Sequence, residues 1–305
     1  MDIFLNICKV TLEEGFMYAI LALGVYITYS ILDFPDLSVD GTMPLGAIIT
    51  GVLILAGMDP WLCLAAAFAC GALAGCVTGL LHVKLHIRPL LCGILVYTAL
   101  LSINLVLLFA LNGGSSVASF FRKPTIFNTF IGALIPQRAG GMYLNTMAVS
   151  LVVALACKLL LDVFLKTKAG LLLRATGDNG QYVALLSQDP GNSKILGLAL
   201  GNGFAALAGS VIAQSKGSAD QQMGVGMVVL GLASVIIGLS VFKKCPLKAT
   251  TMVLLGSIAY KATLTIALAL GLPTEYLKLL MAGIFTLALV SSGKPLRRKR
   301  RAGAC

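Results

Sequence analysis

Two histidines at helical spacing are the residues in this sequence whose types could bind a metal. His82 and His86 stand four residues apart, a spacing that places two side chains on one face of a helix. A zinc site needs a third ligand, such as the glutamate of an H-E-x-x-H motif, but Lys84 separates the histidines and no carboxylate is close in sequence. We therefore predict no metal site and interpret both histidines as polar residues at the end of an apolar segment.

Residues for covalent chemistry are scarce elsewhere. The sequence holds no G-x-x-x-x-G-K-[ST] phosphate-binding loop and no pairing of a nucleophile with a base. We predict a chain that catalyses no reaction and carries no cofactor of its own. Any process driven by ATP would need another chain to hydrolyse it.

A few charges stand inside long apolar segments. Lys261 lies near the middle of GSIAYKATLTIAL, where a charge must face the protein interior and find a partner. It is either held in a structural ion pair or by carbonyl groups, or it lines a pathway. Lys158 and Asp162 are four residues apart and are predicted to pair with each other.

Three amides also stand in apolar segments: Asn104, Asn202 and Gln214. Hydrogen bonding between helices is the favoured explanation, and lining a conduit is the other. The segment 33–42 (DFPDLSVDGT) holds three aspartates, a proline and a glycine. It is either an ordinary acidic loop or a break within a membrane, which is tolerated only where protein or a water-filled cavity covers the backbone.

The composition identifies the elements that position these residues. Of 305 residues, 58% are hydrophobic and 11% are charged, whereas soluble domains carry about 25% charged residues. This excludes a soluble globular enzyme and a disordered chain, and indicates an integral membrane protein. Its long, unalternating apolar runs favour helices over a β-barrel. The eight cysteines show no CxxC spacing, and we interpret them as small core residues, not as a disulfide framework.

The apolar runs predict an all-α polytopic bundle of about eight to nine transmembrane helices. The predicted spans are 13–32, 43–58, 61–81, 89–111, 143–165, 194–214, 223–242, 249–270 and 276–292. Six of the eight residues in KPLRRKRR (294–301) are basic, which predicts a cytoplasmic C-terminal tail over 294–305 after one transmembrane domain over 1–293. Most of the net charge of +11 is then explained by basic residues that mark the cytoplasmic side of the membrane, and we predict no nucleic-acid binding.

The side of each connection follows from counting the predicted membrane crossings back from the cytoplasmic tail. This places the basic connections 82–88, 166–193 and 243–248 on the cytoplasmic side and the N-terminus on the outer side. The segment 170–193 differs from its surroundings, because GQYVALL predicts about two helical turns after a turn or helix start at 177–179. It is either a docking element for a partner or an ordinary interfacial helix. Small residues such as Gly71 and Gly75 predict close helix packing, and the echo of ALAGCV in ALAGSV is weak evidence of an inverted repeat.

Several long blocks in order carry a resemblance that covers about residues 15 to 292. LLLRATGDNGQYVALL, KILGLALGNGFAALAGSVIAQSKGSADQQMGVGMVVLGLASVIIG, PDLSVDGTMPLGA, GLLHVKLHIRPLLCGIL and SINL resemble permeases of ATP-binding-cassette (ABC) importers of the branched-chain amino acid and ribose type. The tryptophan/tyrosine-type subfamily, which includes uncharacterised members, is the most similar. The resemblance implies a type II importer fold.

The resemblance also assigns residues. It implies that the segment after the middle span is a helix coupled to the ATPase, with Arg174, Asp178, Asn179, Gln181, Tyr182 and Leu185 in that role. Gly180 stands where the family usually has proline, and SQDPGN stands where a Gly-Ile-Asn turn is common. The candidates for the substrate pathway, chosen as polar residues in matching blocks, are Asp36, Asp40, Thr42, Asn104 and Asn202.

The function implied is import of a small solute, such as an aromatic amino acid, across the cytoplasmic membrane by alternating access. The implied partners are ABC ATPase subunits that bind ATP and Mg²⁺, an extracytoplasmic solute-binding lipoprotein, the lipid bilayer and a second permease copy, normally forming a homodimer. The alternative is a secondary transporter with its own coupling-ion site, which would need acidic residues at mid-span; here they cluster at 33–40. A membrane enzyme is disfavoured for want of reactive residues.

Overall fold

The computed structural model describes residues 2–111, 115–129, 144–185, 189–243, 245–273 and 276–291. Helices dominate these residues, with one short two-stranded ribbon. In chain order the elements are α1 (Asp2–Val25), the π-helix η1 (Tyr26–Ile31), α2 (Val39–Leu55), α3 (Pro60–Lys84), α4 (Pro89–Leu111), β1 (Val117–Ser119), α6 (Leu144–Phe164), α7 (Lys168–Leu185), α8 (Pro190–Lys216), β2 (Ser218–Asp220), the 3-10 helix η2 (Gln221–Gly224), α9 (Met227–Val241), α10 (Ala249–Ala269) and α11 (Leu277–Ser291).

Each of the nine predicted spans falls on a helix. Within the described ranges, seven helical segments are long and apolar enough to cross a membrane, and two shorter apolar helices, α2 and α11, accompany them. The first span begins earlier than the predicted residue 13, because α1 begins at Asp2 and the apolar segment long enough to cross a membrane is Ile7–Ile31. Lys9, Glu13 and Glu14 lower the local hydropathy there, and the fold accommodates them in ion pairs: Lys9 with Glu13 at 3.7 Å and Glu14 with Lys261 at 2.9 Å.

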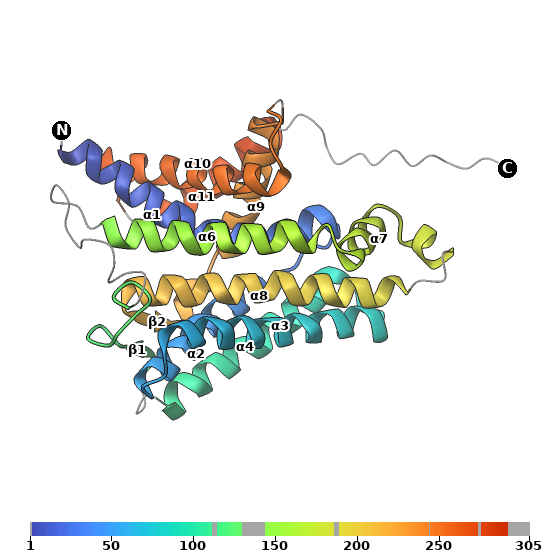
Figure 1. The fold of residues 1–305 in the computed structure, drawn as a ribbon, viewed down its shortest axis with the longest axis horizontal. Helices are drawn as coiled ribbons and strands as arrows, with labels where there is room; N and C mark the ends of the chain where they lie inside the picture. Colours follow the sequence, from blue (N-terminus) through green and yellow to red (C-terminus); the bar gives the residue numbers. More distant parts are fainter. Residues whose placement is uncertain are drawn as a thin grey trace.

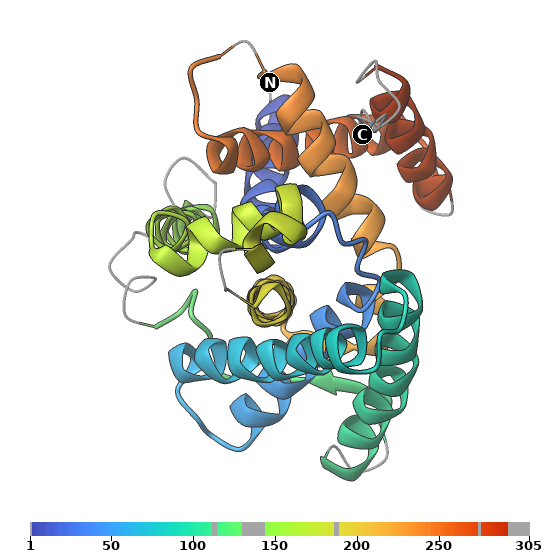
Figure 2. The same cartoon turned by 90° about the vertical axis from the view of Figure 1, so that its right-hand side faces the viewer.

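The helix α8 is the central element of the bundle. It packs mainly against α3, α2 and α1, and its residues are largely buried (Figure 2). Glycines make the α3–α8 contact possible, as predicted from sequence. A Cβ added at Gly75 would lie 2.2 Å from the carbonyl oxygen of Leu198, and one at Gly71 would lie 2.4 Å from the Cβ of Ala206. Only the missing side chains let these two backbones approach so closely.

The bundle has two distinct ends. The helix α7 lies at one end, and the β1–β2 ribbon lies at the other, where α1 also begins (Figure 1). In the ribbon the strands pair antiparallel, with Val117 opposite Asp220. The helix α8 joins the two ends, since Pro190 follows the α7 region and Lys216 leads into β2.

An irregular stretch interrupts the helical path between η1 and α2. Residues 33–37 have no regular structure, and Asp33 has a φ of 55°. The stretch is not an exposed loop, because Phe34, Asp36 and Ser38 are all buried. Asp36 and Ser38 hydrogen-bond to Asn202, which lies near the middle of α8. This geometry supports the interpretation of 33–42 as a break covered by protein over the interpretation as an ordinary loop.

Candidate functional site

A buried polar cluster lies where the irregular stretch meets α8. The Nδ2 atom of Asn202 donates a 2.7 Å hydrogen bond to the Oδ2 atom of Asp36. The Oδ1 atom of Asn202 accepts from the hydroxyl groups of Ser38 at 3.0 Å and Thr42 at 2.9 Å, and Thr78 donates to Ser38 at 3.4 Å. All five side chains are at most 5% exposed. Asn202 is therefore the centre of a network that joins α2, α3 and α8.

The local sequence prepares Asp36 for this position. Its Oδ1 atom accepts from the backbone N–H of Ser38 at 2.8 Å and from the Ser38 hydroxyl at 2.6 Å. With the amide of Asn202, the carboxyl group has three hydrogen bonds that offset the cost of removing it from water. Sequence reasoning selected Asp36, Thr42 and Asn202 but missed Ser38 and Thr78. For Ser38 the signal was its position two residues after an aspartate, the spacing of a side-chain-to-backbone turn.

Asp40 makes a different contact from the other pathway candidates. Its carboxylate accepts from the backbone N–H of Val228 at 2.7 Å and of Gly226 at 3.3 Å. N–H groups at the start of a helix such as α9 have no carbonyl partner within their own helix, and Asp40 supplies one. Asp40 itself lies in the first turn of α2, so the N-termini of α2 and α9 meet. The approach is close, because a Cβ at Gly224 would lie 2.0 Å from the carbonyl oxygen of Asp40.

The remaining amides also bond between elements, as expected. Asn104 donates to the carbonyl oxygen of Gly41 at 3.1 Å and so joins α4 to α2, while its own Oδ1 atom is buried without a hydrogen-bond partner. Gln214 donates to the carbonyl oxygen of Pro60 at 3.3 Å and accepts from the N–H of Ile126 at 2.9 Å. All five pathway candidates therefore lie around the N-terminal half of α2, and three of them share one network.

The helix α7 presents all six coupling candidates at the surface. It is kinked at Asn179, whose φ of −157° and ψ of 90° are not helical. The Oδ1 atom of Asn179 accepts from the N–H groups of Gln181 and Tyr182 at 3.2 and 3.3 Å, so it caps a second short helix. This confirms the predicted helix start. The exposed candidates are Arg174, Asp178, Asn179, Gln181, Tyr182 (58%) and Leu185 (82%).

The embedded charges are paired. The Nζ atom of Lys261 lies 2.9 Å from the Oε2 atom of Glu14 and 3.9 Å from the centre of the Tyr18 ring. Lys158 lies 3.3 Å from Asp162, which confirms the predicted pair, and Asp162 also contacts Lys248 at 3.3 Å and the hydroxyl of Thr250 at 2.6 Å. Asp162 thus joins α6 to the start of α10. The structure supports the interpretation of Lys261 as half of an ion pair.

His82 contacts two other residues of the chain, and His86 lies in the connection that follows the helix of His82. The Nδ1 atom of His82 lies 2.8 Å from the carbonyl oxygen of Ile87, and its Nε2 atom lies 3.3 Å from the Nζ atom of Lys194. His86, with a φ of 55°, follows the end of α3. No group of three His, Cys, Asp or Glu side chains that could hold a metal ion occurs among the residues that the structure describes. The cysteines within those residues are all free thiols, and Cys305 lies outside them.

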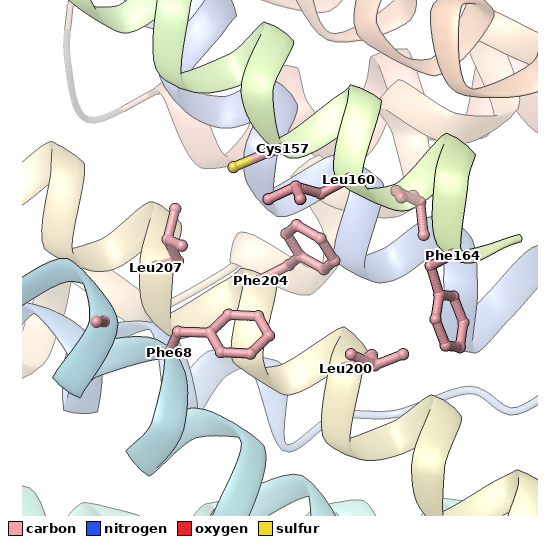
Figure 3. Close-up of a pocket in the computed structure, with 9 residues that line it drawn as sticks. Phe68, Cys157, Leu160, Phe164, Leu200, Phe204 and Leu207 are labelled. Carbon is pink, nitrogen blue, oxygen red and sulfur yellow. The ribbon is translucent and has the colours of Figure 1, made fainter.

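An apolar cavity of about 340 Å³ opens between α3, α6 and α8 (Figure 3). The rings of Phe68 and Phe204 meet edge to face, with their centroids 5.7 Å apart. The remaining lining side chains are also apolar, namely Ala65, Cys157, Leu160, Leu161, Phe164, Leu200 and Leu207. Such a lining offers a charged solute almost no hydrogen bonds, so this cavity suits an apolar ligand group and not a polar substrate.

The long apolar helices define the class of this chain: a multi-pass membrane protein, with a covered break between η1 and α2 where the N-termini of α2 and α9 meet. Residues 11–289 match the family described as branched-chain amino acid transport system / permease component, and the chain belongs to this family.

Individual relatives agree with this placement. The chain is 41% identical over 283 residues to the tyrosine transport system permease protein of Clostridioides difficile (strain R20291), covering 92% of this chain and 90% of the relative. It is 31% identical to an uncharacterised protein of Rickettsia prowazekii (strain Madrid E), covering 94% and 98%. The structure titled PsaBC from Streptococcus pneumoniae in complex with Fab shares the fold, with a TM-score of 0.50, 15% identity, and coverage of 92% and 89%.

Family membership decides between the alternatives drawn from the sequence. The chain is a permease subunit of an ABC importer, and neither a secondary transporter nor an enzyme. Permeases of this kind work with an ATPase and a solute-binding protein in general. Hydrolysis of ATP takes place on the separate ATPase subunit.

Proposed function

We propose that this permease carries an amino acid, with aromatic amino acids the first candidates, across the cytoplasmic membrane. The observation that carries the choice of solute is the 41% identity, over nearly the whole chain, to a relative named for tyrosine transport. ATP and Mg²⁺ bind the partner ATPase. The transport domain comprises residues 1–293, and the basic tail 294–305, which lies outside the described residues, is cytoplasmic.

We assign α7 as the helix that couples the permease to its ATPase. The kink at Asn179 starts a second helix that buries Val183 and leaves Tyr182 and Leu185 exposed. An aromatic and an aliphatic side chain at the surface of a kinked helix, away from the apolar core, suit insertion into a cleft of a protein partner. With this end of the bundle cytoplasmic, the β1–β2 end faces the solute-binding lipoprotein.

The five pathway candidates are buried within a single copy of the chain, apart from the partly buried Asp40. We propose that they serve transport by holding α2 and α9 in a fixed position relative to α8. The pathway would run beside them and be formed with a second permease copy in a homodimer. A change between inward-open and outward-open states would then act on these hydrogen bonds. The substrate would be recognised elsewhere on the chain.

Paired variants test the coupling assignment. Tyr182→Ala combined with Leu185→Ala removes the exposed aromatic and aliphatic side chains of the second helix of α7 without touching the buried Val183. We expect loss of co-purification with the cognate ATPase and loss of ATP-driven uptake in proteoliposomes, with unchanged thermal unfolding of the isolated permease.

The matched control changes the same two residue types at the other end of the bundle. Leu272 and Tyr276 are 38% and 54% exposed near the turn between α10 and α11. Leu272→Ala with Tyr276→Ala should leave ATPase binding intact. Equal losses in both pairs, or full assembly of the α7 variant, would remove the coupling role from α7.

A further inference from the structure

A charged cavity opens between α1 and α8 at the end of the bundle opposite α7. Its volume is about 230 Å³, below the range of about 300–1,000 Å³ typical for drug-sized ligands, which suits a small metabolite. The charged residues in its wall are Glu13, Glu14 and Lys216. Charges of both signs therefore face one space.

These charges do not neutralise one another across the cavity. Glu13 has a buried Oε1 atom with no hydrogen-bond partner, and its nearest cation, the Nζ atom of Lys9, stays 3.7 Å away. None of the four ion pairs within the described ranges joins Lys216 to Glu13 or Glu14. A buried carboxylate oxygen without a donor is costly unless something supplies one.

The rest of the wall is largely apolar, with Ser215 as its polar member. Val10, Met17 and Ile212 line the cavity beside the ring of Tyr18. Lys261 lies over that ring and pairs with Glu14 at 2.9 Å, whereas Glu13 has the longer 3.7 Å pair with Lys9 and a buried Oε1 atom without a hydrogen-bond partner. Exposed Ser215 and Lys216 also line a neighbouring cavity of about 200 Å³. Its wall is mostly polar, with Phe121 and Phe127 beside Lys123, Thr125, Asn128, Thr146 and Gln214. The two cavities therefore adjoin at Ser215 and Lys216.

We infer that this cavity binds a zwitterionic α-amino acid, with its ammonium group at Glu13 and its carboxylate at Lys216. Glu13 has only the 3.7 Å ion pair with Lys9 and keeps a buried Oε1 atom without a hydrogen-bond partner, and Lys216 belongs to none of the ion pairs within the described ranges. A molecule with both charges on one carbon atom complements them. A molecule with a single charge would satisfy one side and leave the other uncompensated. The inference rests on the proposed function for its choice of solute and adds a site on the permease itself.

Three ligands with one carbon skeleton test this site. L-phenylalanine carries both charges, phenethylamine lacks the carboxylate, and 3-phenylpropionate lacks the ammonium group. Each is titrated to millimolar concentration against the full chain in phosphatidylcholine nanodiscs, and thermal unfolding is recorded. We expect L-phenylalanine to raise Tm in a saturable manner. Both analogues should bind at least about tenfold more weakly.

Variants locate the site. Glu13→Gln and Lys216→Gln should each weaken binding of L-phenylalanine by about tenfold or more, and Lys216→Arg should retain it. The matched control is Lys194→Gln, which removes a lysine near the opposite end of the same helix and should bind like the parent chain. Lys216 is exposed, so its variants are expected to fold, and the Tm without ligand checks this.

Several outcomes would overturn the inference: no shift with L-phenylalanine, equal binding of phenethylamine, or unchanged binding in both charge variants. The first result alongside intact ATP-driven uptake would reject this site and keep the proposed function. Binding that persists in a chain unable to support ATP-driven uptake of any amino acid would reject the proposed function and keep the site.

Discussion

The carboxylate of Asp40 accepts a 2.7 Å hydrogen bond from the backbone N–H of Val228, so the first turn of α2 caps the first turn of α9. Two helix N-termini that meet would repel each other, since each carries a partial positive charge. A carboxylate between them offsets that repulsion. The contact joins residues that are 188 positions apart.

Removing this cap should loosen the start of α9. We expect Asp40→Ala to lower the free energy of unfolding by about 1–2 kcal/mol and to speed hydrogen exchange at the amide of Val228. Asp59→Ala is the control, because Asp59 caps α3 by accepting from Trp61 N–H at 2.8 Å. Asp59→Ala should lower the free energy of unfolding by a similar amount without changing hydrogen exchange at the amide of Val228. Unchanged exchange in Asp40→Ala would show that the cap is unimportant.

Replacing Asn202 should lower the free energy of unfolding more than replacing any other side chain of the buried network. Asn202→Leu leaves Asp36 short of one donor and leaves the hydroxyls of Ser38 and Thr42 short of an acceptor. We expect a loss of about 2–4 kcal/mol in SDS-titration unfolding. Ser210→Ala, which removes one hydrogen bond from Thr50 on the same helix pair, should cost about 1 kcal/mol. Equal costs would argue against a network centred on Asn202.

A single methyl group should disturb the contact between α3 and α8. Gly75→Ala places its Cβ 2.2 Å from a carbonyl oxygen of α8, so the helices must separate. The expected loss is about 1–3 kcal/mol in the same unfolding assay. Gly283→Ala in α11 is the control, because no atom lies within 4 Å of the added carbon. That change should be neutral or stabilising by up to about 1 kcal/mol. A stable Gly75→Ala chain would contradict the close approach.

The ion pair between Lys261 and Glu14 should respond unequally to loss of its members. The Lys261 side chain is 9% exposed and that of Glu14 is 43% exposed. Glu14→Gln leaves a buried ammonium group without its acid, and we expect a cost of about 1–3 kcal/mol. Lys261→Met leaves an acid that water can reach, and it should cost less, about 1 kcal/mol. Thermal unfolding of both variants in one detergent gives the order, and the reverse order would refute this account.

Local patterns in the sequence were sufficient for the helices and for contacts between near neighbours. Runs of about 20 apolar residues predicted the spans because the bilayer imposes that length on any helix that crosses it. The pair Lys158–Asp162 followed from its four-residue spacing, and the close helix packing at Gly71 and Gly75 followed from two small residues on one face. Each of these features depends on geometry within a single helix.

Tertiary structure alone decided which polar residues from different helices meet. Asp36 and Asn202 are 166 positions apart, and Lys261 and Glu14 are 247 apart, so no spacing rule connects them. The same limit hid Ser38 and Thr78, whose hydroxyls become part of a network only after α2 and α3 pack on α8. A buried polar group must find a partner, which the sequence predicts in general. The identity of that partner depends on how the helices pack, and packing is a property of the whole bundle.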